Sequence, residues 1–224
     1  LKEGVVDSSP LSDTPRPGNA KFKKLTPVDP NSTNPYQLTE ADRTVIGNTT
    51  PKFSGGFGLN ATYKGFDMSM FFNFMYDFDV LNANKIMLTT WADNKENNFL
   101  MDIASDKRWR NFDDMGNEIR YSPEVLAEFN KNATMWNPTS IGRPICMSYA
   151  VEDGSFLRLN SATLGYTLPS VWTKKVGLSK VRFYVSGNNL FTLTGYSGYD
   201  PEVNIATGLT PNIDNNRYPR SRTY

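Results

Sequence analysis

Two neighbouring stretches between positions 53 and 76 alternate apolar and polar side chains. A period of two places successive side chains on opposite faces of a β-strand, whereas a helix would repeat every 3.6 residues. Lys64 and Gly65 separate the two stretches and predict a tight reversal. The pattern therefore predicts a β-hairpin, whose returning strand has Ser69 and Asn73 on its polar face and a strongly apolar face made of Phe66, Met68, Met70, Phe72 and Phe74.

A second pair of alternating stretches begins near position 157. In the first of them, Leu164 and Tyr166 share the apolar face, and Pro169 ends the strand because proline has no amide hydrogen to donate. Leu157 and Leu159 have the opposite parity, so one extra residue near positions 160 and 161 would return them to the same face. We therefore predict a β-bulge there. The following strand, from about position 180 to 190, has an apolar face formed by Val181, Phe183 and Val185.

The rest of the chain lacks this alternation. Prolines interrupt residues 1–50 at six positions, which predicts a long loop, with a capped turn at residues 39–42. Residues 77–154 form another long polar and aromatic region, in which Ser122, Pro123 and Glu124 favour the start of a helix. We predict a short helix there, from about Pro123 to Asn132.

Composition removes several classes of function. The 24 basic and 23 acidic residues nearly cancel, so we expect no nucleic acid as a partner. The chain has no histidine, and its single cysteine, Cys146, forms neither an internal disulfide nor a thiolate metal cluster; we expect a packed thiol. Residues 29–34 hold too few oxygen ligands for a calcium loop. We therefore assign no catalytic, cofactor-binding or metal-binding residue.

The length of the predicted strands bears on their surroundings. They run for about 11 to 14 residues, longer than the usual five or six of a soluble sheet and enough to cross a bilayer when tilted. No stretch approaches the roughly 20 apolar residues of a membrane-spanning helix. The alternation by itself favours the buried face of a soluble β-sandwich, whereas the strand length favours the outer face of a transmembrane barrel. Both interpretations are open at this point.

Four motifs occur in a fixed order: DRTVIGNTTPKFSGGFGLNATYKGF from position 42, DGSFLRLNSATLGYTLP from 153, VRFYVSGNNLFTLTGYSGYDPEV from 181 and YPRSRTY from 218. Together they closely resemble the C-terminal barrel segment of the SusC/RagA family of TonB-dependent outer-membrane transporters. The resemblance covers residues 41–224 well and 17–40 loosely. It implies an all-β fold, in which antiparallel strands form the C-terminal part of a large transmembrane β-barrel with long extracellular loops containing short helices.

The resemblance also implies a function. Residues 1–224 would form one part of an outer-membrane importer of oligosaccharides, or of oligopeptides, with the plug domain and most of the closing strand outside this sequence. Such an importer is powered through TonB, works with a SusD-like surface lipoprotein and makes or breaks no bond, so we expect no enzyme activity. Alternatives from other classes are a secreted β-sandwich glycan-binding protein and a barrel that acts only as an adhesin or scaffold.

Connection lengths give an orientation. Short and long connections alternate along the chain, so we expect the strands to run down, up, down and up, with a last descending strand beginning near Arg222. The segment 191–222 would then lie outside the cell, where Trp136, Tyr196 and Tyr199 would contact substrate or partner. Trp172 would lie at the periplasmic interface. The residues expected to face lipid are Phe66, Met68, Met70, Phe72, Phe74, Leu164, Tyr166, Val181, Phe183 and Val185.

Overall fold

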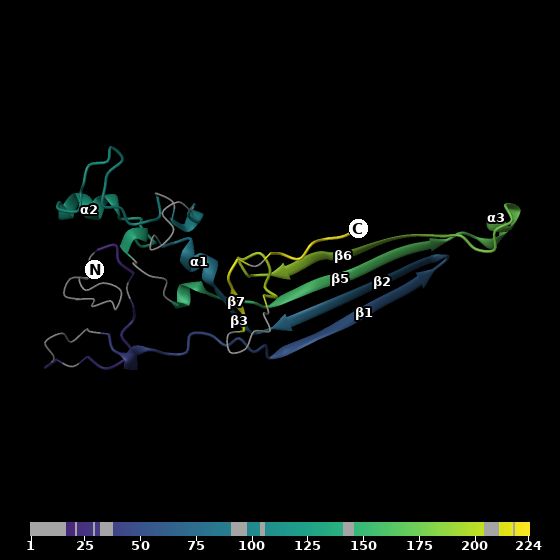
Figure 1. Ribbon diagram of the computed structural model, residues 1–224, viewed down its shortest axis with the longest axis horizontal. Helices are drawn as coiled ribbons and strands as arrows, with labels where there is room; N and C mark the ends of the chain where they lie inside the picture. The colour runs from purple at the N-terminus through teal and green to yellow at the C-terminus, as the bar shows by residue number, and fades with distance from the viewer. Residues whose placement is uncertain are drawn as a thin grey trace. The chain divides into compact units, whose positions relative to one another are not determined.

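The computed structural model describes residues 17–20, 22–28, 30–31, 38–90, 98–103, 106–140, 146–203, 211–216 and 218–224. They belong to two compact units (Figure 1). The first comprises residues 1–46 and 83–150, and the second comprises residues 47–82 and 151–224. Each unit is described by itself below.

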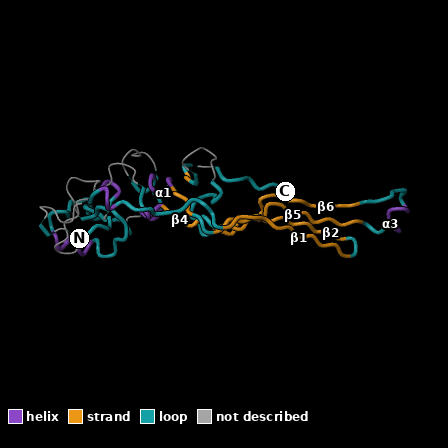
Figure 2. Tube along the Cα trace, turned by 90° about the horizontal axis from the view of Figure 1, so that it is seen from below, coloured by secondary structure: helices purple, strands orange, loops and turns teal. Residues whose placement is uncertain are grey.

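Four long antiparallel strands form the main sheet of the second unit (Figures 1 and 2). They are β1 (Phe53–Tyr63), β2 (Phe66–Tyr76), β5 (Phe156–Thr167) and β6 (Arg182–Thr194). Each strand pairs with the next long strand along the chain, in the order β1-β2-β5-β6. The predicted hairpin at Lys64 and Gly65 is confirmed, and both turn residues have positive φ angles, 46° and 91°.

One face of this sheet is apolar across all four strands. The register places Phe57 opposite Phe72, and their rings stack with centroids 4.9 Å apart. Phe72 also meets Phe191 of β6 edge-on, at 6.4 Å. Nearer the other end, Phe66 packs against Tyr166 at 4.4 Å. Much of this face is exposed in the chain, including Phe53, Phe57, Leu59, Tyr63, Phe66, Leu164, Phe183, Val185 and Leu193.

The predicted bulge keeps β5 on that face. In the ladder with β2, Leu159 lies opposite Phe72 and Ser161 opposite Phe71, so the register omits Asn160. A matching irregularity in β6, which the sequence did not predict, separates Asn188 from Phe191 in the ladder with β5. The extra residue lets Leu157 and Leu159 share a face with Leu164, as the change of parity requires.

The opposite face of the sheet is polar and contains an ion pair between non-neighbouring strands. The guanidinium of Arg182 on β6 forms two bonds to the carboxylate of Asp67 on β2, with N–O distances of 3.0 and 2.5 Å. Gly165 of the intervening strand β5 lies between them. A Cβ atom at Gly165 would lie 2.4 Å from Arg182 Nη2 and 2.7 Å from the Asp67 oxygens. The pair in this arrangement therefore fills the space that a Cβ at position 165 would occupy.

A second, small sheet lies in the same unit and was not predicted. It has the order β4-β3-β7, formed by β3 (Asp79–Asn82), β4 (Val151–Asp153) and β7 (Ile213–Asp214). β3 pairs antiparallel with β4 and parallel with β7. A hydrophobic core adjoins it, made of Phe78, Val80, Phe156, Tyr196 and Val203.

The end of the chain returns to β6. Asn188 and Thr223 form an antiparallel bridge, in which each backbone N–H donates to the other residue's carbonyl at 2.9 and 3.2 Å. One isolated antiparallel bridge thus lies where the last strand was expected to begin, and that strand stays a prediction. At the end of the main sheet away from the small sheet, the connection between β5 and β6 contains a short helix, α3 (Ser170–Lys175). Trp172 on this helix is 60% exposed.

Short helices characterise the described part of the first unit: η1 (Glu40–Asp42), α1 (Ala83–Met87), η2 (Met101–Ile103), α2 (Pro123–Phe129), η3 (Pro138–Ser140) and η4 (Ser148–Ala150). The helix predicted at Pro123 is confirmed, although it ends three residues earlier than expected. None of the helices in the described ranges is long and apolar enough to cross a membrane.

Two local expectations in this unit have different outcomes. The capped turn is confirmed, because the backbone N–H of Thr39 donates to the carboxylate of Asp42 at 2.9 Å. That carboxylate also accepts hydrogen bonds from the backbone N–H groups of Thr26 and Leu25. These bonds, led by that of Thr26, hold the pKa of Asp42 well below its usual range.

The expectation of a packed Cys146 is wrong. This residue is exposed, since it lies in a connecting segment just before η4 and not on a packed strand face.

Candidate functional site

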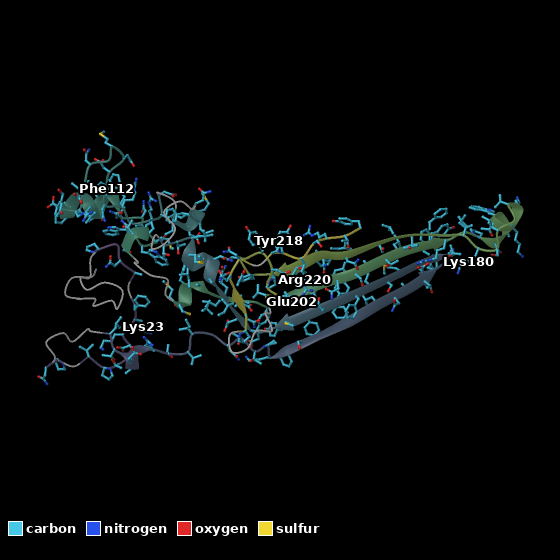
Figure 3. All side chains as sticks on the ribbon, viewed as in Figure 1. Lys23, Phe112, Lys180, Glu202, Tyr218 and Arg220 are labelled. Carbon is cyan, nitrogen blue, oxygen red and sulfur yellow. The ribbon has the colours of Figure 1, made fainter. Side chains whose placement is uncertain are left out.

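A pocket of about 510 Å³ opens on the polar face of the main sheet, where β5 and β6 meet the segment that follows β6. Its strand residues include Arg158 of β5 and Thr192 of β6, which are partners in the antiparallel ladder. The segments at 199–201 and 219–222 complete the lining, with Tyr199, Arg220 and Arg222. Figure 3 shows Glu202 and Arg220 near this end of the sheet and Lys180 at the other end.

Arg158 is the centre of an ion network beside the pocket. Its side chain is 2% exposed, and its Nη2 lies 2.5 Å from Asp200 Oδ1. Its Nη1 lies 3.7 Å from Glu202 Oε2, and the other oxygen of Glu202 lies 2.7 Å from Nη2 of Arg220. A buried guanidinium is stable only when carboxylates compensate its charge. The network therefore fastens both the 200–202 segment and the 220 segment to strand β5.

A second set of contacts holds the segment directly after β6. The hydroxyl of Tyr196 donates to the Asp214 carboxylate at 2.6 Å, inside the core. Ser197 donates from its backbone N–H and its hydroxyl to Glu152, at 2.9 and 2.8 Å. Burial, followed by the bond to Asp214, raises the pKa of Tyr196 far above its ordinary value. Tyr196 therefore stays protonated and keeps donating over the physiological pH range.

The residues expected to contact substrate or partner have different environments. Tyr199 is 77% exposed and lines the pocket. Tyr196, only three residues earlier, is 6% exposed and is a core residue, so the expectation that its ring is open to a partner needs correction. Trp136 belongs to the first unit, where it is half-buried, donates from Nε1 to the Thr89 carbonyl at 3.1 Å and packs edge-on against Tyr149.

The residues expected to face lipid share one face of the main sheet, except Val181, which lies just before the first residue of β6. The β2 members of this set align with those of β5 in the ladder, Phe66 with Tyr166 and Met68 with Leu164. Phe183 and Val185 of β6 continue the same rows. Ser69 and Asn73 lie on the opposite face, in register with Thr163 and Arg158. That this face contacts lipid stays a prediction.

The sequence reasoning missed Arg158, Asp200, Glu202 and Arg220. One signal for Arg158 was present, since it is the only charged residue of strand β5 and falls on the polar face. Its partners follow β6, more than 40 positions later, and no local pattern links them to it. Only the folded register brings these four side chains together.

Other acidic residues have structural partners. Asp113 accepts from the side chain and backbone of Asn117, which lower its pKa, and Asp114 pairs with Arg110 at 2.7 Å. Within the described ranges, no three His, Cys, Asp or Glu side chains group closely enough to hold a metal ion. The segment 29–34 that was considered for calcium lies outside the described residues except at positions 30 and 31.

Comparison with known proteins identifies relatives of the chain. No family model matches it. The TonB-dependent receptor P3 of Formosa agariphila is 34% identical over 99% of this chain and 19% of the receptor. The TonB-dependent receptor SusC of Bacteroides thetaiotaomicron is 38% identical over 34% of the chain and 7% of the receptor. The chain thus spans about a fifth or less of the length of these relatives.

Solved structures agree with the sequence relatives. The RagAB peptide importer in the open-open state has a TM-score of 0.57 and 25% identity over 84% of this chain and 18% of that one. Another structure of the RagAB peptide transporter reaches a TM-score of 0.61 at 24% identity over the same shares. Both matches cover 84% of this chain, whose main four-stranded antiparallel sheet is open. The chain is therefore a SusC/RagA-like segment of the TonB-dependent receptor type.

Proposed function

We propose that this chain forms part of the barrel wall of an outer-membrane, TonB-energised importer of nutrient oligomers. The observation that carries the proposal is the 34% identity to a TonB-dependent receptor over 99% of the chain. The protein makes or breaks no bond in this role. It provides a surface for lipid on one side and a polar surface for the transported molecule on the other.

The dimensions of the strands support a membrane position. A strand of 11 residues, the length of β1 and β2, is about 36 Å long and spans about 25 Å at a tilt of 45°. This matches the apolar band of outer-membrane barrels, which is about 25 Å tall. A soluble sandwich would cover the apolar face with a second sheet, whereas Phe53, Phe183 and Leu193 of that face are each more than 60% exposed in the chain described.

The polar and apolar faces suggest roles for individual residues. The lipid-facing set comprises Phe66, Met68, Met70, Phe72, Phe74, Leu164, Tyr166, Val181, Phe183 and Val185. The polar face, with the pocket at one end, lines the lumen. We place the segment 191–222, apart from its first four residues, which belong to β6, at the extracellular rim. Trp172 lies near the periplasmic headgroups, where aromatic girdles of barrels lie.

The partners follow from the relatives. A SusC-type and RagAB-type importer is expected to act with a SusD-like lipoprotein and with TonB, and to carry an oligosaccharide. An oligopeptide is the second candidate substrate, favoured by the RagAB structures, which are those of a peptide importer. Tyr199 is the exposed aromatic residue that we propose to meet this substrate or the lipoprotein.

Uptake by intact cells tests the proposal. Cells that carry the complete transporter should accumulate a labelled nutrient oligosaccharide or oligopeptide, and deleting either the transporter gene or the TonB gene should abolish accumulation. Surface binding of the label should survive the loss of TonB, because binding needs no energy. Unchanged uptake in both deletion strains, or recovery of the protein in the soluble secreted fraction, would contradict an energised outer-membrane importer.

A further inference from the structure

The pocket on the polar face has more cationic than anionic groups. Three guanidinium groups line it, those of Arg158, Arg220 and Arg222, and two carboxylates, Asp200 and Glu202, pair with them. Asp200 pairs with Arg158, and Glu202 is shared between Arg158 and Arg220. Among the residues that the structure describes, Arg222 forms no ion pair and no side-chain hydrogen bond. The site therefore has one positive charge in excess.

Arg158 adds a buried donor to this excess charge. Its side chain is 2% exposed, and its Nε donates to none of the described residues. A buried N–H without an acceptor is costly, and native proteins supply such groups with a partner in the great majority of cases. Glu202 Oε2, 3.7 Å from Arg158 Nη1, is likewise buried without a hydrogen bond, so the network is incomplete on both its donor and its acceptor side. Because Arg158 lines the pocket, an acceptor that reached its Nε from there would satisfy this nitrogen and compensate the excess charge.

The remaining lining suits a small polar ligand with a flat side. Thr192 and Asn189 offer hydroxyl and amide groups, and Tyr199 adds an aromatic ring that is largely exposed. The volume of about 510 Å³ lies within the usual range for a small-molecule site. Guanidinium groups bind carboxylates through charge-assisted hydrogen bonds that fix orientation as well as charge.

We propose that this pocket is a carboxylate-binding subsite, in which Arg222 and the buried Arg158 hold a carboxylate of the transported oligomer while Tyr199 packs against the adjoining ring or side chain. The proposal rests on the import function proposed above and narrows its substrate to an acidic one. The carboxylate has two possible sources, an acidic sugar or the C-terminus of a peptide, and the chemistry at the arginines is the same for both.

Matched ligand pairs test the subsite on the complete transporter in detergent. Titration calorimetry compares trigalacturonate with its methyl ester, and tetra-alanine with its C-terminal amide. For one pair we expect the carboxylate form to bind about tenfold more tightly, the effect of one strong charge-assisted contact. Arg222→Gln should remove this preference without disturbing the Arg158 network, and Arg222→Lys should retain part of it. Lys180→Gln, at the other end of the sheet, should leave it unchanged.

Each outcome has one meaning. A preference for trigalacturonate over its ester identifies an acidic glycan, and a preference for free tetra-alanine identifies a peptide terminus. Equal binding within both pairs, or a preference that persists in Arg222→Gln, overturns the subsite. Competition by sodium sulfate as effective as that by the preferred carboxylate also overturns it, since the site would then be a general anion site. TonB-dependent uptake without any carboxylate preference refutes the subsite alone, whereas a preference without energised uptake refutes the import function and leaves the subsite standing.

Discussion

Tyr196 and Tyr199 lie in the same segment after β6 and have opposite environments. Tyr196 is 6% exposed and bonded to Asp214, whereas Tyr199 is 77% exposed. Their sequence context, GYSGYD, gives both the same apparent role as a surface aromatic residue. At the scale of single residues, the difference comes from contacts with Asp214 and the small sheet, which lie outside any local pattern.

Tyr196→Phe should loosen this segment. The substitution keeps the ring and removes the donor to a carboxylate that is 1% exposed, a loss worth about 1–3 kcal/mol. Hydrogen exchange measured by mass spectrometry on the complete transporter should show faster exchange in the segment 195–203 and in β7. Tyr199→Phe is the matched control and should leave exchange unchanged. Equal effects of both substitutions would contradict the assigned roles.

The same contact predicts a dependence on pH. The pKa of Tyr196 is raised in the folded state, chiefly by burial. Its stabilising contribution is therefore complete below about pH 10, the ordinary pKa of tyrosine, and decreases as pH rises above that value, because the opened segment releases a proton that the closed one keeps. Exchange in the segment 195–203, corrected for the intrinsic rate, should accelerate above about pH 10 in the native protein. In Tyr196→Phe this additional acceleration should be absent.

At the scale of elements, the sequence predicted those strands and turns that follow from a locally repeating pattern of side chains. The four long strands, the tight turn and the bulge at Asn160 all follow from an alternation sustained over many positions. The strands β3, β4 and β7 have two to four residues each, too short for a period to be visible, and the partner of β3 in the parallel pair lies about 130 positions away. The pocket was missed because its lining residues are far apart in the sequence, on β5, β6 and two later segments.

Adjacent substitutions on β2 test the two faces of the sheet. Met70 lies in register with Leu59 and Ala162 on the apolar face, and Ser69 is exposed on the polar face. Met70→Arg should cost about 2–4 kcal/mol in folding free energy near the bilayer midplane, whereas Ser69→Arg should cost little. The urea concentration at the midpoint of unfolding, measured in lipid vesicles, reports the change in folding free energy of both variants. Ser69 is a better control position than Asn73. Asn73 lies opposite Arg158, so Asn73→Arg would place two cations side by side.

Deleting Asn160 should be more damaging than any single substitution in β5. Without the bulge, the parity of residues 156–159 reverses, which moves Leu157 and Leu159 to the polar face and Arg158 to the apolar one. We expect loss of assembled protein in the outer membrane, measured by the heat-modifiable band on electrophoresis. Deletion of Met115, which is 90% exposed in the first unit, should be tolerated and serves as the control.

At the scale of the whole molecule, the two ends of the main sheet should lie on opposite sides of the membrane. The segment after β6 leaves one end, and the connection with α3 lies at the other. Single cysteines at Gly195, where a side chain meets nothing within 4 Å, and at the exposed Ser179 test this after replacement of Cys146. An impermeant maleimide applied to intact cells should modify position 195 and spare position 179. The reverse pattern would invert the orientation and the proposed direction of substrate entry.

The ion pair that crosses β5 above Gly165 has a consequence for the family's evolution. Asp67 and Arg182 meet in the space left by the missing side chain of the strand between them. These three positions should therefore change together among relatives: where a larger residue replaces the glycine, the acid and the base lose their contact and are free to diverge. Residue covariation in an alignment would then link β2 directly to β6, two strands that are not neighbours, and a contact map inferred from covariation would wrongly place them side by side.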